Sequence, residues 1–203
     1  DQVLHIVYID TTEGWMPILD KAVTDDVPVG PNSNENGIFG YGAAPTGTMA
    51  TYGNIVSSAG VVASDVALAG TGRENLSACE YGADKGIFGF GYSVSSYENV
   101  TNLVSNAGVV ASDTAGVGTA RYGLAACTYG GDKGIFGFGR DSSAVTAVTN
   151  LVSNAGVVAT DVTGVGTARR YVAATEYSAD KDKGIFAYGN TGSVTAISNL
   201  VSN

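Results

Sequence analysis

DKGIFGFG, at residues 84–91, occurs four times with small changes in this chain of 203 residues. The phrase returns at residues 132–139, and altered forms stand at residues 182–189 (DKGIFAYG) and 35–42 (ENGIFGYG). A second phrase, NLVSNAGVVASD at residues 102–113, recurs at nearly the same step of 48 or 49 residues. Two phrases repeated in register indicate a tandem array of units about 48 residues long.

Each unit has the pattern of four short β-strands separated by turns. In the unit at residues 121–168, the segments LAACTYG, GIFGFG, VTNLVSN and GVVATD are rich in Val, Ile, Thr and aromatic residues. The connections GGDKG and SNAGV contain glycine and suit hairpins in which one residue has a positive φ. The pattern predicts an all-β chain, a β-propeller-like array of about four four-stranded antiparallel blades preceded by an N-terminal β-hairpin.

The chain divides into three parts. We expect an N-terminal β-hairpin or attachment segment at residues 1–22, built from VLHIVYID and WMPIL, and a linker at residues 23–36 that holds two of the four prolines. The repeat domain then covers residues 37–203. Its units lie near residues 37–73, 74–121, 122–169 and 170–203.

The strand count does not close a ring. The repeat domain provides fourteen predicted strands, whereas four blades need sixteen. Either the hairpin or another subunit supplies the missing two, or the edge strands stay open to pairing. Residue 1 is Asp rather than Met, which favours a processed product or a fragment of a longer protein.

The alternation of glycine and aromatic residues in GIFGFG predicts how the blades pack. With a side-chain period of two, Phe88 and Phe90 share one face of the strand, and Ile87 and Gly89 share the other. We expect each aromatic ridge to fill the glycine-lined hollow of a neighbouring blade, and the alternative is a ligand that approaches the glycines closely. The repeated ring positions are Phe39, Phe88, Phe136 and Phe186.

Two charged positions also follow the repeat. An aspartate ends each GVVASD-type phrase, an arginine follows eight residues later, and we expect a repeated Asp–Arg contact within or between blades, worth about 0–1 kcal/mol at a surface. Calcium binding at the aspartates is the alternative. These residues are Asp65, Asp113, Asp161, Arg73, Arg121 and Arg169.

Catalytic and metal-binding patterns are scarce. His5 is the only histidine and lies in the predicted hairpin, so no Ser-His-Asp or Cys-His arrangement is indicated. Cys79 and Cys127, at equivalent places in successive units, are expected to be small core residues, with a disulfide as the alternative. They offer no zinc-ligand spacing, and no metal, cofactor or enzymatic activity is expected. Glu80 and Glu176 share one strand register and are the best pair for glycoside chemistry.

Charge and hydropathy restrict the partners. The 19 acidic and 10 basic residues give a net charge of -9, which repels nucleic acid. No stretch reaches the roughly 18–20 apolar residues of a membrane-spanning helix, so membrane insertion is not expected.

The loop after the second strand differs in every unit, in contrast to the copied strands. Its sequences are AAPTGTMATYG, YSVSSYE, RDSSAVTA and NTGSVTA. Variable loops on a rigid scaffold are typical of binding proteins, although neutral variation of solvated loops explains the pattern equally well. Because Tyr and Arg dominate interface hot spots, the candidate binding residues include Tyr92, Tyr97 and Arg140, together with Asp141.

The repeats resemble two known groups. The order of a small-apolar strand, KGIFGFG, a variable loop, TNLVSN and a strand leading to GTAR resembles a kelch-type propeller repeat, although the tryptophan usual in the fourth strand is missing. The sequence TNLVSNAGVVASDTAGVGTARYGLAACTYGG resembles the tandem repeats in virion structural and tail-fibre proteins of tailed phages, notably cyanobacterial and marine phages, more closely than it resembles kelch repeats. This resemblance covers about residues 36–203, and VYIDTTEGW resembles segments that precede distal domains of phage fibres.

The phage resemblance implies a function and a location. It implies a non-enzymatic virion structural protein, a fibre or appendage module of the extracellular particle whose propeller-like domain binds a host surface or decorates the particle. Other virion proteins would be its partners, and a homo-oligomer, such as the trimer usual for fibres, is expected. The alternatives are a carbohydrate-binding propeller lectin that binds a host-surface glycan, and a glycoside-acting enzyme that uses Glu80 and Glu176.

Overall fold

The computed structural model describes residues 6–10, 14–17 and 36–202. The described residues form fourteen strands and no helix, so the prediction of an all-β chain is confirmed. The chain forms two compact units, Asp1–Ser33 and Asn34–Asn203. In the first, β1 (Ile6–Asp10) pairs antiparallel with β2 (Gly14–Pro17) as the predicted hairpin. His5 lies outside the described residues.

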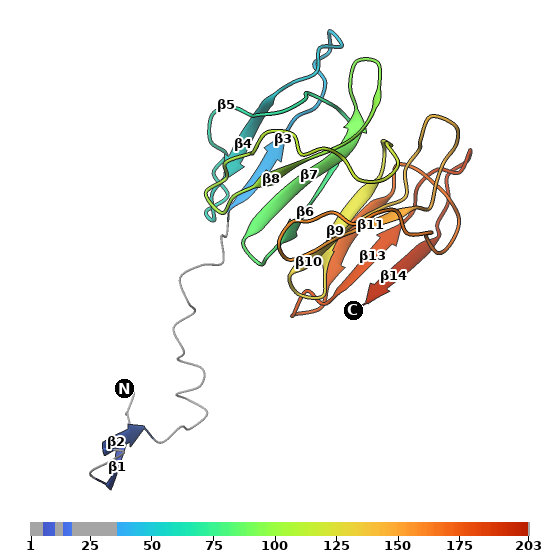
Figure 1. Cartoon of the computed structure of the whole chain (residues 1–203). Helices are drawn as coiled ribbons and strands as arrows, with labels where there is room; N and C mark the ends of the chain where they lie inside the picture. Colours follow the sequence, from blue (N-terminus) through green and yellow to red (C-terminus); the bar gives the residue numbers. More distant parts are fainter. Residues whose placement is uncertain (1–5, 11–13, 18–35, 203) are drawn as a thin grey trace. The chain divides into compact units, whose positions relative to one another are not determined.

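The second unit contains four three-stranded antiparallel sheets, one for each sequence repeat, which follow one another in chain order (Figure 1). β1 and β2 form a separate sheet, so β1 is not a strand of the fourth sheet. The first sheet contains β3 (Gly37–Gly40), β4 (Tyr52–Val56) and β5 (Val66–Ala67), and the second contains β6 (Ser77–Tyr81), β7 (Lys85–Tyr92) and β8 (Tyr97–Val104). The third contains β9 (Ala125–Tyr129), β10 (Lys133–Gly137) and β11 (Thr149–Val152), and the fourth contains β12 (Ala173–Tyr177), β13 (Lys183–Ala187) and β14 (Ser198–Ser202).

The predicted fourth strand, GVVATD, does not form a full ladder. Residues 155–162 contact β11 through two isolated bridges, Val152 with Val158 and Thr149 with Val162, and residues 107–114 contact β8 in the same way. The side-chain amide of Asn150 donates to the carbonyl of Ala159 (3.1 Å), so a side chain replaces a ladder bond. The expected four-stranded blades are therefore three-stranded sheets in the described residues, and residues 107–114 and 155–162 are here named the return segments.

In the second, third and fourth repeats, the ring of the GIF phrase fills a glycine hollow on the preceding sheet. A Cβ atom added at Gly89 would lie 2.8 Å from Cζ of Phe136, and one added at Gly137 would lie 3.1 Å from the Phe186 ring. The rings thus occupy space that only glycine leaves open, and the predicted packing is confirmed. Phe39, the equivalent residue of the first repeat, is 69% exposed.

The two rings of GIFGFG do not share one face, contrary to the expected alternation. Phe88 packs against Tyr41 of the first sheet, with ring centroids 5.4 Å apart, whereas Phe90 packs against Phe136 of the third sheet at 5.2 Å. Phe90 has a φ of 61°, and the β7–β8 register shifts beside it. This bulge interrupts the period of two and turns the Phe90 ring to the other face. One strand therefore packs a ring against each of its two neighbouring sheets.

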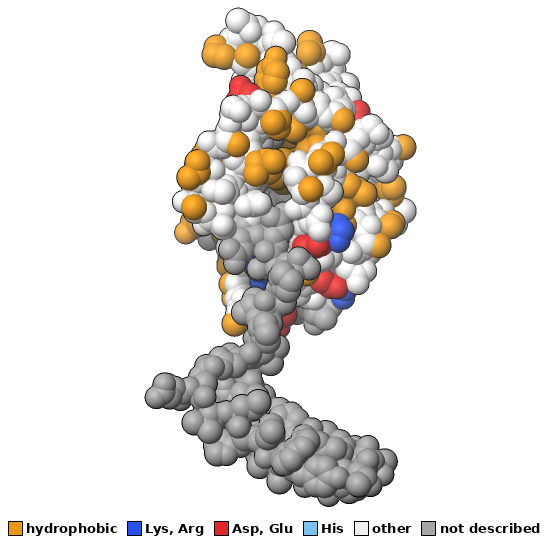
Figure 2. All heavy atoms as spheres, turned by 90° about the vertical axis from the view of Figure 1, so that its left-hand side faces the viewer, with side chains coloured by type: hydrophobic (Ala, Val, Ile, Leu, Met, Phe, Trp, Pro, Cys, Tyr) orange, Lys and Arg blue, Asp and Glu red, His pale blue; other side chains and the backbone are white. Residues whose placement is uncertain are grey.

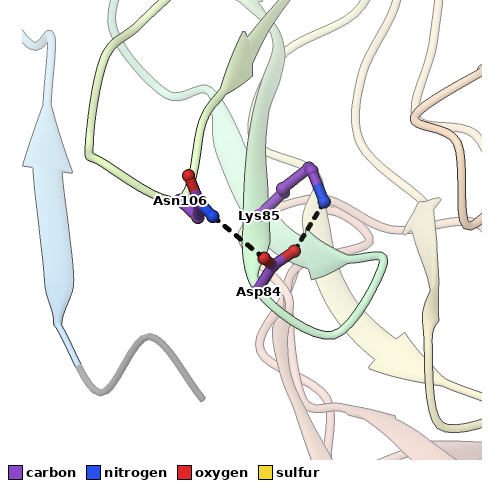
Figure 3. Close-up of polar contacts among 3 residues, drawn as sticks. All are labelled: Asp84, Lys85 and Asn106. Carbon is purple, nitrogen blue, oxygen red and sulfur yellow. Dashed lines mark hydrogen bonds and ion pairs between the residues drawn. The ribbon is translucent and has the colours of Figure 1, made fainter. Parts of the chain in front are cut away.

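The two copied phrases meet at the hairpin turns. Asn106, in the turn after β8, donates to one carboxylate oxygen of Asp84 (3.2 Å), and Lys85 pairs with the other (2.6 Å) (Figure 3). Asn154 donates to Asp132 in the next unit (3.0 Å). The DKG and SNAG turns are thus copied together because they contact each other.

Both cysteines are unbridged and pack as small core residues. A Cβ atom added at Gly134 would lie 2.5 Å from Sγ of Cys79, and one added at Gly184 would lie 2.6 Å from Sγ of Cys127. Burial raises the pKa of both thiols, that of Cys127 to about 12. The alternative expectation, a disulfide between Cys79 and Cys127, is therefore wrong.

Candidate functional site

The three repeated arginines are fully buried between consecutive sheets. Arg121 donates from Nε to the carbonyl of Phe138 (2.9 Å), from Nη1 to that of Thr119 (3.0 Å) and from Nη2 to Oδ1 of Asn150 (2.6 Å). Its guanidinium lies over the Phe90 ring of the second sheet. Arg73 makes the equivalent bonds one unit earlier. Each arginine therefore joins two sheets and satisfies the carbonyl of a residue with a positive φ, namely Phe90, Phe138 or Tyr188.

The expected direct Asp–Arg contact is replaced by a relay through asparagine. Asp161 accepts from Nδ2 of Asn150 (2.9 Å) and from the backbone N–H and hydroxyl of Thr119 (3.0 and 2.6 Å). Asn150 thus accepts from Arg121 through its oxygen and donates to Asp161 through its nitrogen. The partners lie 40 residues apart, from successive units, rather than eight, because stacking brings each arginine to the next unit's aspartate.

Burial and hydrogen bonding shift the pKa values of this relay in opposite ways. Burial lowers the pKa of Arg121 to about 10, although the charge of Asp161 raises it. Partial burial raises the pKa of Asp161, but hydrogen bonds from Thr119 and Asn150 hold it below its usual value. Both groups are charged at neutral pH, and the relay is part of the architecture. The described residues contain no group of three or more His, Cys, Asp or Glu side chains that could hold a metal ion.

A cluster of aromatic rings lies where the variable loops leave the sheets. The Tyr92 and Tyr97 rings lie 5.4 Å apart, Tyr97 and Tyr122 lie 5.5 Å apart, and Tyr122 and Tyr171 lie 6.1 Å apart. Arg170 donates from Nη1 to the Tyr122 hydroxyl (2.5 Å), and its guanidinium lies 4.9 Å from the centroid of Tyr171. We name these four tyrosines and Arg170 the tyrosine belt.

The belt is accessible and held in place by the backbone. Tyr171 is 53% exposed, and its backbone N–H donates to the carbonyl of Gly123 (2.6 Å). Tyr92 lies opposite Tyr97 in the β7–β8 ladder. Partial burial raises the pKa of Tyr171, and the neighbouring Tyr122 adds to this effect. The hydroxyl is therefore neutral and able to donate or accept a hydrogen bond at physiological pH.

The structure brings three of the four predicted binding residues to this region. Tyr92 and Tyr97 are in the belt, and Arg140 exchanges two backbone hydrogen bonds with Tyr122 (3.0 and 2.9 Å). Asp141 instead accepts from the N–H groups of Ser143 (2.7 Å) and Ala144 (2.8 Å) within its own turn. Its carboxylate thus shapes a loop.

Three belt residues were missed from the sequence, namely Tyr122, Arg170 and Tyr171. The residue after each repeated arginine varies, and it pairs with the first residue of a variable loop: Glu74 with Tyr92, Tyr122 with Arg140, and Arg170 with Asn190. The sequence signal for Tyr122 and Arg170 was that the residue immediately after the repeated arginine differs from unit to unit. It shows that two variable positions from each of these three units meet at one end of the sheets.

The paired carboxylates gain no catalytic support. Glu80 and Glu176 do share a register, opposite Gly86 and Gly184, but Glu80 forms an ion pair with Lys181 (2.8 Å).

Within the described part of the chain, no helix is long and apolar enough to cross a membrane.

No protein-family model and no curated protein matches this chain. The tyrosine belt and the buried arginine relays must therefore be interpreted from their own geometry.

Proposed function

We propose that this chain is a non-enzymatic structural module of a phage virion, a fibre or appendage component of the extracellular particle. Its sheets act as the blades of a propeller-like array, and the end that carries the tyrosine belt faces outward to bind a host surface. The belt is the observation that carries the binding role. The resemblance of the repeat sequences to those of phage virion proteins supports the virion setting.

The chemistry of the belt suits recognition of a surface. Tyrosine offers a large, rigid contact area with a polar tip, so little conformational entropy is lost when a partner packs on it. Arg170 adds a guanidinium already oriented by Tyr122. Tyr and Arg are also the residues that contribute most to binding at protein interfaces. A rigid scaffold with variable residues at one end is the arrangement that a host-binding module needs.

A glycan is the second candidate ligand, and the spacing of the belt rings favours it. Sugar rings expose C–H groups that pack on aromatic faces, and the tyrosine hydroxyls and Arg170 supply hydrogen-bond partners for sugar hydroxyls. Successive ring centroids from Tyr92 to Tyr171 lie 5.4 to 6.1 Å apart. The chain then acts as a carbohydrate-binding lectin, on the virion or apart from it.

Association with further copies or with other virion proteins is the third part of the proposal. The first sheet and the loop beside it have an apolar surface. The exposed fractions of its residues are 69% for Phe39, 59% for Tyr52, 65% for Val61 and 58% for Val62. Figure 2, seen from the side of the first sheet, shows hydrophobic side chains gathered on that face. We propose a second copy of the chain as its occupant, because the equivalent Phe88 is buried by the sheet before it. Light scattering checks the mass, and a monomer at all concentrations contradicts the oligomer.

Binding to intact cells and to a glycan array tests the role of the belt. Labelled full chain is incubated with candidate host cells, cyanobacteria first, and with the array. Tyr122→Ala and Arg170→Ala are compared with Tyr177→Ala, which removes an exposed tyrosine outside both the belt and the association face. We expect the belt variants to bind at least about tenfold more weakly, as hot-spot truncations do, and the control to bind normally.

The outcomes separate the candidates. Binding to cells with no signal on the array favours a protein or other non-glycan receptor, whereas binding to both favours the lectin. Equal binding by the wild type and both belt variants, with unchanged thermal unfolding, contradicts a binding role for the belt. Mass spectrometry of purified particles from the phage whose genome encodes the chain tests the virion setting, and absence from those particles contradicts it.

A further inference from the structure

The relays at the first two of the three boundaries between the repeat sheets are complete, and both use an aspartate from a return segment. Asp113 accepts from Thr71 and Asn102, and Asn102 accepts from Arg73. Asp161 does the same one unit later. In both cases the asparagine Nδ2 also donates to a carbonyl of the return segment, that of Ala111 or Ala159. The return segment therefore supplies both acceptors that orient the asparagine toward the arginine.

The relay of the fourth sheet is incomplete. Arg169 donates from Nε to the carbonyl of Tyr188 (2.7 Å) and from Nη1 to that of Thr167 (3.0 Å), as the other two arginines do in their units. Its Nη2 has no partner among the described residues, and neither has Oδ1 of Asn199, although both atoms are buried. These are the two atoms that pair in the other relays. An unpaired buried polar atom costs more stability than a hydrogen bond contributes.

The missing part corresponds to one segment. Asn199 donates from Nδ2 to the carbonyl of Val165 (3.2 Å), a different direction from that of Asn102 and Asn150. Among the described residues, β14 is hydrogen-bonded only to β13, and none forms with β14 the bridges that a return segment makes with β8 or β11. Leu200 on this strand is 69% exposed. The outer edge of β14 is thus open to another strand, beside an unfinished relay.

The charge of the fourth relay is also unbalanced. Arg73 and Arg121 are each accompanied by an aspartate whose charge opposes the effect of burial on the arginine pKa, whereas burial alone lowers the pKa of Arg169. Arg169 is nevertheless fully buried. A carboxylate placed as Asp161 is would offset this buried positive charge.

We propose that the open edge of β14 binds an extended polypeptide segment, supplied by another chain, that carries an aspartate in a Val-Val-Ala-Ser/Thr-Asp pattern. The aspartate accepts from the backbone N–H and hydroxyl of Thr167 and from Nδ2 of Asn199. This turns Oδ1 of Asn199 to Nη2 of Arg169, while the valines pack against Val201. The ligand is a strand rather than a free carboxylate, because the internal relays also use a return-segment carbonyl and backbone bridges.

A peptide with the sequence of residues 153–163, labelled with a fluorophore, tests this proposal. Its binding to the full chain is followed by fluorescence anisotropy, and amide hydrogen exchange reports on Ser198–Ser202. We expect saturable binding, protection of β14, and at least about tenfold weaker binding of a peptide with Asp161→Ala, because hydrogen bonds to a charged group are strong.

Matched variants of the protein locate the site. Thr167→Val removes the hydroxyl donor of the fourth relay and should weaken peptide binding about tenfold, whereas Thr167→Ser should restore it. Thr119→Val makes the same change in a relay that is already complete, so peptide affinity should stay unchanged. Both residues are exposed, and thermal unfolding checks that each variant is folded.

Several results would overturn the proposal. They are no saturable binding at millimolar peptide, equal binding of the Asp161→Ala peptide, or binding of N-acetyl-aspartate amide as tight as that of the peptide. The first excludes a strand site, the second excludes the carboxylate, and the third leaves only a small-carboxylate site. Tyr122→Ala should bind the peptide like the wild type, so failure of the host-binding proposal would not affect this one.

Discussion

The guanidinium carbon of Arg121 lies 4.1 Å from the centroid of the Phe90 ring, at the boundary between the second and third sheets. The same arginine donates from Nε to the carbonyl of Phe138, whose φ is 63°. The left-handed conformation, which costs about 1–3 kcal/mol for a residue other than glycine, is thus held by a charged hydrogen bond. An aromatic ring, a left-handed residue and a buried arginine form one structural unit at each boundary.

Arg121→Met should lower the free energy of unfolding by about 3–5 kcal/mol, because Asn150 and the Phe138 carbonyl lose their buried donors. Urea denaturation measures the change. Arg140→Met, in a variable loop, is the control and should change stability by less than about 0.5 kcal/mol. A loss below about 1 kcal/mol for Arg121→Met would contradict a stabilising role for the relay.

Gly89→Ala should destabilise the fold by about 1–3 kcal/mol, because the new Cβ would lie 2.8 Å from Cζ of Phe136. Gly37→Ala is the matched control, since its nearest atom would lie 3.8 Å away. Thermal unfolding compares the two. Adding Phe136→Leu to Gly89→Ala should cost less than the two changes summed, and simple additivity would argue against direct packing.

Stability should fall below about pH 4, in part because Asp113 and Asp161 have lowered pKa values. The folded chain keeps these carboxylates ionised where the unfolded chain, with a pKa near 3.8, already binds protons, so their contribution is present above that pH and is lost as pH falls further. Asp161→Asn should destabilise the chain at neutral pH and flatten its acid dependence. Asp180→Asn, at an exposed position, is the control for the loss at neutral pH and should change stability there by less than about 0.5 kcal/mol.

Cys79 and Cys127 should react slowly with a thiol reagent in the folded chain and rapidly in urea, because burial raises both pKa values. Their contribution to stability is present below the ordinary thiol pKa of 9.0 and is lost as pH rises toward about 12 for Cys127. Cys127→Ala should reduce this alkaline loss. Equal labelling rates with and without urea would show that the sites open readily.

The sequence was informative wherever local rules apply. Tandem copies of GIFGFG and TNLVSN predicted strands that the ladders of β7, β10 and β13 confirm. The sequence also predicted that the Phe136 ring packs in the hollow at Gly89, because an aromatic ring fills the volume that a missing side chain leaves. The prediction that Phe88 and Phe90 share one face was wrong, because a side-chain period of two assumes a regular strand. The positive φ of Phe90 interrupts that regularity, and nothing in a phenylalanine's identity predicts it.

The site was less predictable than the fold. Tyr92 and Tyr97 were found because they stand in a visibly variable loop. Tyr122 follows the copied Arg121, Tyr171 stands two residues after the copied Arg169, and their rings join the cluster only in the folded chain. The sequence by itself determined the repeat, the hairpins and the all-β class, since turn chemistry and strand propensity act over a few residues. Only the tertiary structure decided which aspartate serves which arginine and which tyrosines meet, because stacked sheets bring together residues 40 or more positions apart and burial then requires that every polar atom find a partner.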